Sequence, residues 1–135
     1  MTEKQITITL SPDQARILRD AIDLLHRLKL GQVEELRDVW LDRCKDDWDK
    51  REGVEILAGQ IKRIVFPELS GSGHSYGVGS DLGVDVQRMY EIYKVLDHAL
   101  WRCEPVDKRF TTNAGDPYLL RYSGDPKIPF EVRDV

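Results

Sequence analysis

Residues 11–14, Ser-Pro-Asp-Gln, fix where an extended segment ends and a helix begins. Serine is a preferred N-cap, proline fits the first helical position, and glutamine three residues after the serine completes a capping box. Before this junction, Ile6, Ile8 and Leu10 alternate with polar residues, which predicts a half-buried strand over Lys4–Leu10. The chain is therefore expected to open with a strand that leads directly into a helix.

Apolar residues recur at helical spacing in four segments that follow the junction, which predicts four helices. The segments are Pro12–Leu30, Gln32–Asp49, Arg51–Val65 and Val84–Cys103. Their expected inward stripes are Ala15, Leu18, Ile22 and Leu25; Val33, Leu36, Trp40, Cys44 and Trp48; Val54, Leu57, Ile61 and Ile64; and Val86, Met89, Tyr90, Tyr93, Leu96, Leu100 and Cys103. Gly31 is expected to end or kink the first helix, Pro67 to end the third, and Gly53 to mark a break between the second and third.

Three short strands are predicted in the segment from residue 105 onward. They are Arg109–Thr112, Tyr118–Tyr122 and Phe130–Arg133, separated by turn-forming residues. The N-terminal strand is expected to pair with one of them. The sequence thus predicts one α+β domain over residues 1–135, with an N-terminal strand, a hairpin-like core of about four helices and short C-terminal antiparallel strands. Because a two-stranded ribbon is marginal by itself, helices, further strands or a second subunit must cover it.

Composition narrows the classes of protein and partner. The chain is 41% hydrophobic and 33% charged, which is typical of a globular domain, and its formal net charge of −4 disfavours duplex nucleic acid and anionic membranes as partners. No apolar run approaches the ~20 residues of a membrane span, and no secretory signal is visible, so a cytoplasmic location is expected. The two cysteines and three histidines lack metal-ligand spacing, which predicts buried reduced thiols, no metal site and no cofactor.

A glycine-rich segment between Glu68 and Gly83 is the first candidate site. Its glycines match neither a dinucleotide fingerprint nor a Walker loop. Two interpretations stay open: a mobile loop, or a loop whose backbone amides and side chains contact a ligand. In the second case Tyr76 would stack on a base and His74 would bind a phosphate or ribose. Ser75 and Gly77 would be their neighbours in that site.

The segment around residue 109 is the second candidate. Arg109 and Arg121 could bind phosphates, Phe110 could stack on a base, and Thr112 and Asn113 could add hydrogen bonds. Alternation along a strand places Arg109 and Asn113 on one face and Phe110 and Thr112 on the opposite face. A single strand therefore cannot aim all four at one ligand. An ordinary strand with a basic side is the competing interpretation.

Two parts of the chain resemble a family of small tailed-phage proteins. The first comprises 6–15 and 21–35, which includes A-I-D-L-L-H-R-L-K-L-G-Q-V-E-E; the second comprises 75–78 and 90–101, which includes Y-E-I-Y-K-V-L-D-H-A-L-W. We connect this family to the phage Thoeris anti-defence sponges, which are oligomers that sequester cyclic nucleotide immune signals. The resemblance implies a homo-oligomer, a dimer or hexamer, that binds a cyclic ADP-ribose isomer or a cyclic oligonucleotide, such as a CBASS signal, without degrading it.

Within the stretches of resemblance, Arg27 and Tyr76 match the use of an arginine for phosphates and an aromatic ring for the base. No nucleophile elbow is present, and we expect a binding protein rather than an enzyme. Two alternatives remain. One is an inhibitor of a host defence protein that docks through the acidic face of the second helix, at Asp42, Asp46 and Asp47. The other is a phosphodiesterase that degrades the signal.

Overall fold

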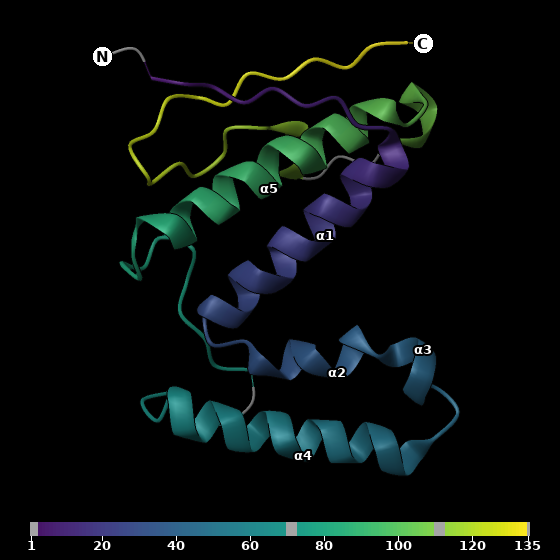
Figure 1. Ribbon diagram of the computed structural model, residues 1–135, viewed down its shortest axis with the longest axis vertical. Helices are drawn as coiled ribbons and strands as arrows, with labels where there is room; N and C mark the ends of the chain where they lie inside the picture. The colour runs from purple at the N-terminus through teal and green to yellow at the C-terminus, as the bar shows by residue number, and fades with distance from the viewer. Residues whose placement is uncertain (1–2, 70–72, 110–112, 135) are drawn as a thin grey trace.

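The computed structural model describes residues 3–69, 73–109 and 113–134, and the fold of these residues is all-helical. Its elements are α1 (Pro12–Lys29), η1 (Val33–Glu35), α2 (Leu36–Val39), α3 (Leu41–Cys44), α4 (Trp48–Val65), α5 (Val84–Cys103), η2 (Val106–Lys108) and η3 (Asn113–Gly115). Figure 1 shows α1 and α5 side by side, with α2 and α3 between that pair and α4. The described residues form no strand, so the predicted α+β class is wrong.

Helix α1 begins and ends as the sequence predicts. The Ser11 side chain accepts a hydrogen bond from the Gln14 amide at 3.2 Å, and the Gln14 side chain accepts one from the Ser11 amide at 3.0 Å, which confirms the capping box. At the other end Gly31 has φ +93°, a conformation that L side chains rarely adopt. A Cβ there would also collide with the Leu69 side chain. Glycine is therefore favoured by the backbone turn, while the Leu69 side chain would have to move to accommodate a Cβ.

Helices α1 and α5 form the main packed pair, and the predicted bounds of α5 are confirmed. Val86, Val95 and Leu100 of α5 are buried, and an ion pair of 3.2 Å joins Arg19 of α1 to Asp97 of α5. Two predicted inward positions at the helix ends are wrong: Leu25 is 45% exposed and Cys103 is exposed. Cys103 is the last residue of α5, whereas Leu25 precedes His26, the residue of α1 that is buried against Tyr90 of α5.

The predicted second helix, Gln32–Asp49, is broken into η1, α2 and α3. Trp40 interrupts it with φ −110° and ψ 30°, and Asp47 then caps α4 by accepting a hydrogen bond from the Lys50 amide at 3.1 Å. Gly53 consequently lies inside α4, and the break predicted there is wrong. Trp40 and Trp48, expected to face inward, are 47% and 72% exposed.

Helix α4 is rotated about its axis by roughly one residue, about 100°, from the predicted orientation. Leu57, Ile61 and Ile64 were expected to face the core, but they are 59%, 43% and 79% exposed. The buried residues of α4 are Ala58 and Lys62, which lie toward η1 and α2. The small alanine allows close approach, and the Lys62 ammonium binds Glu34 at 3.1 Å. The rotation of the helix is thus fixed by a buried ion pair between Lys62 and a residue of another element, Glu34.

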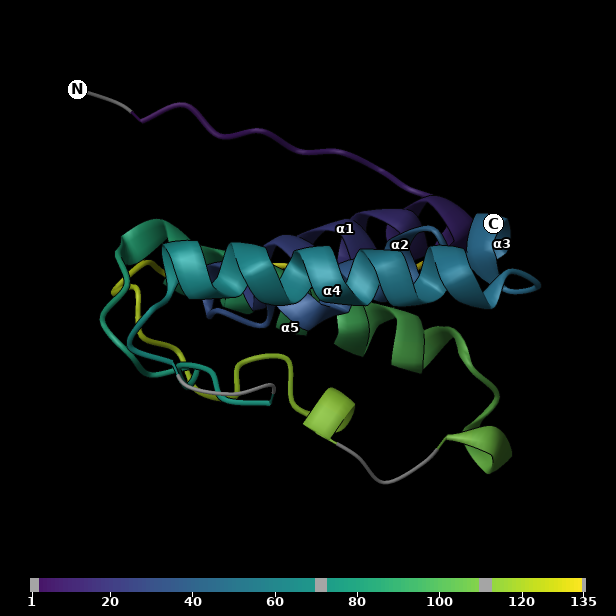
Figure 2. The same cartoon turned by 90° about the horizontal axis from the view of Figure 1, so that it is seen from below.

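The predicted N-terminal strand is an extended, exposed arm of residues 3–10. Ile6 is 92% and Ile8 is 64% exposed, and no strand pairing forms in the part of the chain that the structure describes. Figure 2 shows the arm leaving the body of the molecule where α1 begins. The alternation of Ile6, Ile8 and Leu10 gives the right backbone conformation, but a strand also needs a partner, and the arm runs away from every described segment that could supply one.

The predicted tail strands fail because side chains and turns engage their backbone. Leu120 has φ +58°, and the Tyr122 and Ser123 amides donate to the Glu91 carboxylate rather than to a neighbouring strand. The segment 130–133 is extended, with Phe130 and Val132 half-buried and the residues between them exposed, yet it is unpaired. Of the strand predicted at 109–112, only Arg109 is described, and it follows η2; residues 110–112 lie outside the described residues.

His26 is a buried titratable group between the two main helices. Its exposed fraction is 4%, its Nε2 atom has no hydrogen-bond partner among the described residues, and its ring centroid lies 5.5 Å from that of Tyr90. Burial lowers the pKa of His26 below its ordinary value of 6.5, because the charged ring cannot be solvated there.

We predict that the protein loses stability as the pH falls from about 7.5 to about 5.5. In this range the unfolded chain binds a proton that folded His26 resists, so the free energy of unfolding decreases with decreasing pH. Urea unfolding at several pH values measures it. A His26→Phe variant, which keeps a ring against Tyr90, should show a smaller pH dependence. Equal slopes in the two proteins would remove His26 as the cause.

Candidate ligand-binding site

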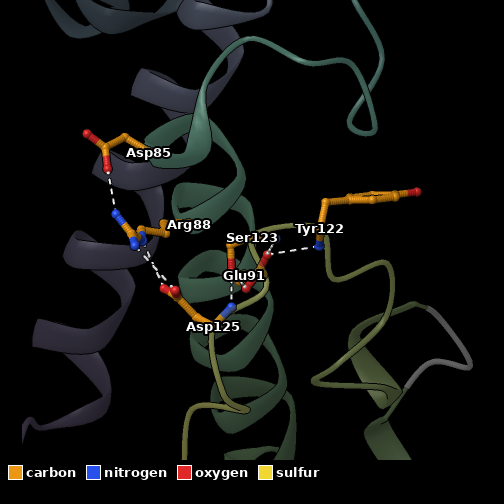
Figure 3. Close-up of polar contacts among 6 residues, drawn as sticks. All are labelled: Asp85, Arg88, Glu91, Tyr122, Ser123 and Asp125. Atoms are coloured by element: carbon orange, nitrogen blue, oxygen red, sulfur yellow. Dashed lines mark hydrogen bonds and ion pairs between the residues drawn. The ribbon is translucent and has the colours of Figure 1, made fainter.

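A buried carboxylate on α5 holds the tail against the helix (Figure 3). Glu91 is 7% exposed and accepts three hydrogen bonds: from the Tyr122 amide at 3.0 Å, the Ser123 amide at 2.8 Å and the Ser123 hydroxyl at 2.5 Å. The Ser123 hydroxyl in turn accepts from the Asp125 amide at 3.0 Å. The turn at 122–125 is therefore bound to one side chain and fixed in position.

An arginine one turn earlier on α5 binds the same turn. The Arg88 guanidinium donates to both carboxylate oxygens of Asp125, at 2.8 and 3.3 Å, and to Asp85 at 3.2 Å. The hydrogen bonds from Arg88 hold the pKa of Asp125 below its ordinary value. These groups are solvent-exposed, so they contribute little stability, but the two parallel bonds fix the orientation of the turn.

Anchoring the turn creates a small hollow between α5 and the tail. A cavity of about 110 Å³ is lined by Arg88, Glu91, Ile92, Asp125 and Ile128. A smaller hollow beside it is lined in part by Tyr118, Arg121 and Lys127. Ligand pockets for small molecules usually measure about 300–1,000 Å³, so neither hollow in one copy encloses a nucleotide.

Two cations without a carboxylate partner lie at this second hollow. No ion pair joins Arg121 or Lys127 to an acid within the described residues, whereas Arg27, Arg88 and Lys62 all have one. The Lys127 ammonium lies 5.1 Å from the centroid of the Tyr118 ring, whose hydroxyl donates to the Ile128 carbonyl at 2.9 Å. We call Tyr118, Arg121 and Lys127 the cationic corner. Two cations beside a held aromatic ring can bind an anion and stack on a planar group.

Of the cationic corner, the sequence reasoning identified Arg121 and missed Tyr118 and Lys127. A signal was present: Ser-Gly-Asp-Pro at 123–126 is a strong turn sequence. A turn brings the residues on its two sides together, so Arg121 and Lys127 could have been paired from the sequence. Tyr118 could not, because its place depends on the left-handed backbone at Leu120.

A second cluster joins the end of α1 to the loop that follows residue 73. Arg27 donates to the Gln32 side chain at 3.2 Å, and the Gln32 amide group donates to the Ser75 hydroxyl at 3.4 Å. The Tyr76 amide donates to the Leu30 carbonyl at 2.8 Å. Three of the predicted ligand-binding residues, Arg27, Ser75 and Tyr76, are thus brought together.

The charges of this junction oppose its predicted role in phosphate binding. Arg27 is paired with Asp23 at 2.9 Å and Glu35 at 3.5 Å. Burial disfavours the charged form of Arg27, but the hydrogen bond and charge of Asp23 outweigh it and raise the pKa of Arg27. With the Lys62–Glu34 pair, the junction holds two cations and three carboxylates, a formal charge of −1. Arg27 therefore serves to hold the junction together.

His74 and Gly77 contribute backbone rather than side-chain contacts to the junction. The His74 carbonyl accepts from the Lys62 ammonium at 2.6 Å, and the His74 side chain is exposed. The Gly77 carbonyl accepts from the Ser80 amide at 3.0 Å in a turn. The buried Lys62 thus ties α4 to the loop, a role that the sequence did not reveal because lysine is normally exposed.

The segment around Arg109 forms a third group at the far end of α5. The Arg109 guanidinium donates to the carbonyls of Glu104 at 3.0 Å and Arg102 at 2.6 Å and lies 5.0 Å from the Trp101 ring centroid. It satisfies carbonyls at and just beyond the helix C-terminus, which favours a structural role. Asn113 accepts through its carbonyl from buried Lys94 at 2.6 Å. Phe110 and Thr112 lie outside the described residues.

The predicted site residues therefore do not form one site in a single copy. The junction lies near Tyr90, which contacts His26, and Arg109 lies on Trp101. These two positions are separated by about 17 Å along α5, at 1.5 Å per residue. Arg121 belongs to the cationic corner, beside Glu91.

Comparison with protein-family models, with curated proteins and with solved structures found no match. Among the described residues, no helix is long and apolar enough to span a membrane, and no group of three or more potential metal ligands is present.

We predict that Glu91→Ala destabilises the protein by about 2–3 kcal/mol, because it removes hydrogen bonds to a charged group and leaves amides of the tail unpaired. Urea unfolding measures the loss. Limited trypsin digestion should also cut sooner after Arg121 and Lys127. Glu52→Ala, at an exposed site on α4, is the control and should change neither. Wild-type resistance to trypsin in Glu91→Ala would mean that Glu91 does not hold the tail.

Proposed function

We propose that this chain is a binding protein that sequesters an anionic cyclic nucleotide without degrading it. The observation that carries the proposal is the cationic corner, where Arg121 and Lys127 lack acid partners among the described residues and lie beside the ring of Tyr118. A cyclic nucleotide offers phosphates to the two cations and a base to the ring. The resemblance to Thoeris anti-defence sponges supplies the ligand class, a cyclic ADP-ribose isomer or cyclic oligonucleotide.

Rigidity of the corner supports sequestration. A protein that removes a scarce signal needs tight binding, and affinity rises when the site is ordered before the ligand arrives. Glu91 and Arg88 fix the turn between Arg121 and Lys127 through bonds of 2.5–3.3 Å. The entropy cost of ordering this turn is therefore incurred on folding and not on ligand binding.

The limited size of the hollows supports a site shared between copies. A cavity of about 110 Å³ cannot surround a nucleotide, so in this proposal a neighbouring subunit covers the exposed side of the ligand. This agrees with the homo-oligomer that the resemblance implies. The junction of Arg27, Gln32 and Ser75 has a negative formal charge and is not the phosphate-binding site of this proposal.

Exposed tryptophans favour a second candidate function, docking on a host protein. Trp40 and Trp48 are 47% and 72% exposed and lie close in sequence to the exposed acids Asp42 and Asp46. Tryptophan is enriched among residues that dominate binding energy at protein interfaces. Reversal of Asp42 and Asp46 would test this candidate; Asp47 should be left intact because it caps α4.

We predict that the purified protein captures one ligand from a panel of cyclic di- and trinucleotides and cyclic ADP-ribose isomers. After removal of free ligand and heat denaturation, mass spectrometry should recover that ligand intact. Arg121→Ala and Lys127→Ala should each weaken its binding by about 1.5–3 kcal/mol, roughly 10- to 100-fold, because each removes a charged hydrogen bond. Titration calorimetry measures the change.

Arg133→Ala is the matched control, since Arg133 is an exposed tail cation already paired with Glu131 at 2.8 Å. It should leave the affinity within about twofold. A fragment of altered mass would indicate a phosphodiesterase. The alternative outcome is that the protein retains no ligand and loses a host-protein complex when the charges of Asp42 and Asp46 are reversed. That pair of results would support docking on a host protein and contradict sequestration.

A further inference from the structure

The exposed stripe on α4 has the spacing of a helix-pairing seam. Val54, Leu57, Ile61 and Ile64 follow one another at intervals of three, four and three residues, the a and d positions of a heptad. We call these four residues the α4 seam. Three of them are 43–79% exposed, and Val54 is half-buried. A contiguous exposed apolar stripe of this kind marks an interaction surface.

The elements that the structure describes leave three of the four seam residues, Leu57, Ile61 and Ile64, exposed. Ala58 and Lys62, on another side of α4, pack toward η1 and α2 and are 3% and 5% exposed. In Figure 1, α4 forms the outer edge of the fold, and α2 and α3 separate it from α1 and α5. The rotation of α4 is fixed by the bond from Lys62 to Glu34, so the seam cannot turn inward without breaking a buried ion pair.

We propose that the α4 seam binds the α4 seam of a second copy in an antiparallel pair. In antiparallel coiled-coil packing an a position lies opposite a d position of its partner. One register satisfies this in all four layers: Val54 lies opposite Ile64 of the second copy, and Leu57 lies opposite Ile61. The arrangement is two-fold symmetric and closes after two copies.

The charges at the two ends of α4 favour an antiparallel pair with a second copy of the chain. Lys50 lies four residues before the seam and Glu68 four residues after it. In the antiparallel register Lys50 approaches Glu68 of the second copy at both ends of the pair. In a parallel pair Lys50 would face Lys50, an unfavourable like-charge contact. Gly53 and Gln60, which flank the seam on one side, are uncharged, so the centre of the pair desolvates no charge on that side.

Glu68 is exposed and lies three residues beyond the end of α4. Its carboxylate accepts a hydrogen bond from the Tyr76 hydroxyl at 2.9 Å. The proposal depends on α4 and its two ends alone. It holds or fails whatever ligand the cationic corner binds, because association is measured without a ligand.

Sedimentation velocity over a range of concentrations tests the proposal. The wild-type chain should be a dimer at micromolar concentration, and Leu57→Lys should raise the dissociation constant at least ~100-fold, because the seam would then bury an unpaired ammonium. Ile56→Lys is the matched control: the neighbouring residue is 54% exposed, close to the 59% of Leu57, but lies off the seam. It should stay dimeric. Circular dichroism checks folding, and Ile64→Lys replaces Leu57→Lys if that variant unfolds.

A charge exchange tests the register. Lys50→Glu should weaken the dimer several-fold, and adding Glu68→Lys should restore it, because the opposite charges meet again between copies. The proposal that the α4 seam pairs would be overturned by any of three results. These are a monomeric wild type, a dimer that survives the seam substitutions, and a loss of dimer affinity in Ile56→Lys equal to that in Leu57→Lys. If Leu57→Lys breaks the dimer but Glu68→Lys does not restore the dimer weakened by Lys50→Glu, the seam stands and the antiparallel register is wrong.

Discussion

Packing of α1 against α5 is the contact on which the remainder of the structure depends. Of the hydrophobic side chains buried in the described residues, Val86, Val95 and Leu100 belong to α5, and the loop after residue 73 attaches to the end of α1 through the Leu30 carbonyl. The tail attaches to the outer side of α5 through Glu91. Loss of this helix pair would therefore release the junction and the cationic corner together.

Charged side chains, rather than strand ladders, organise the irregular segments. Glu91 binds two tail amides, Lys62 binds the His74 carbonyl, and Lys94 binds the Asn113 carbonyl. Each of these side chains is buried, with an exposed fraction of 3–7%. Burial disfavours the charged form of Lys94 and lowers its pKa. A buried charge is tolerated only when it is well bonded, so these contacts also select one position for each segment.

The sequence predicted those features that are set by neighbouring residues. The capping box at Ser11, the glycine turn at Gly31 and the bounds of α5 each follow from local chemistry and are confirmed. It failed where distant residues decide the outcome. The rotation of α4 depends on a pair between Lys62 and Glu34, 28 residues apart. The strand predicted at 118–122 is missing because the Tyr122 amide is bound by Glu91, 31 residues away in sequence.

The same distinction applies to the candidate site. Arg27 and Ser75 were singled out by residue type, and the structure does bring them together, but only the neighbouring carboxylates reveal that Arg27 is already neutralised. Arg121 was singled out in the same way and has no such partner in the described chain. Whether an arginine is free to bind an anion therefore depends on the acids around it, which sequence alone does not report.

The small core links stability to association. Seven hydrophobic side chains are buried in the described residues, while Ile6, Ile17, Trp48 and Ile64 are each more than 70% exposed. Burial of apolar surface supplies most of the favourable free energy of folding, so an isolated copy is only marginally stable. A partner that covers such surface binds the folded chain and not the unfolded one, and stability then rises with protein concentration. Folding, assembly and completion of a shared ligand site would be coupled through the same apolar contacts.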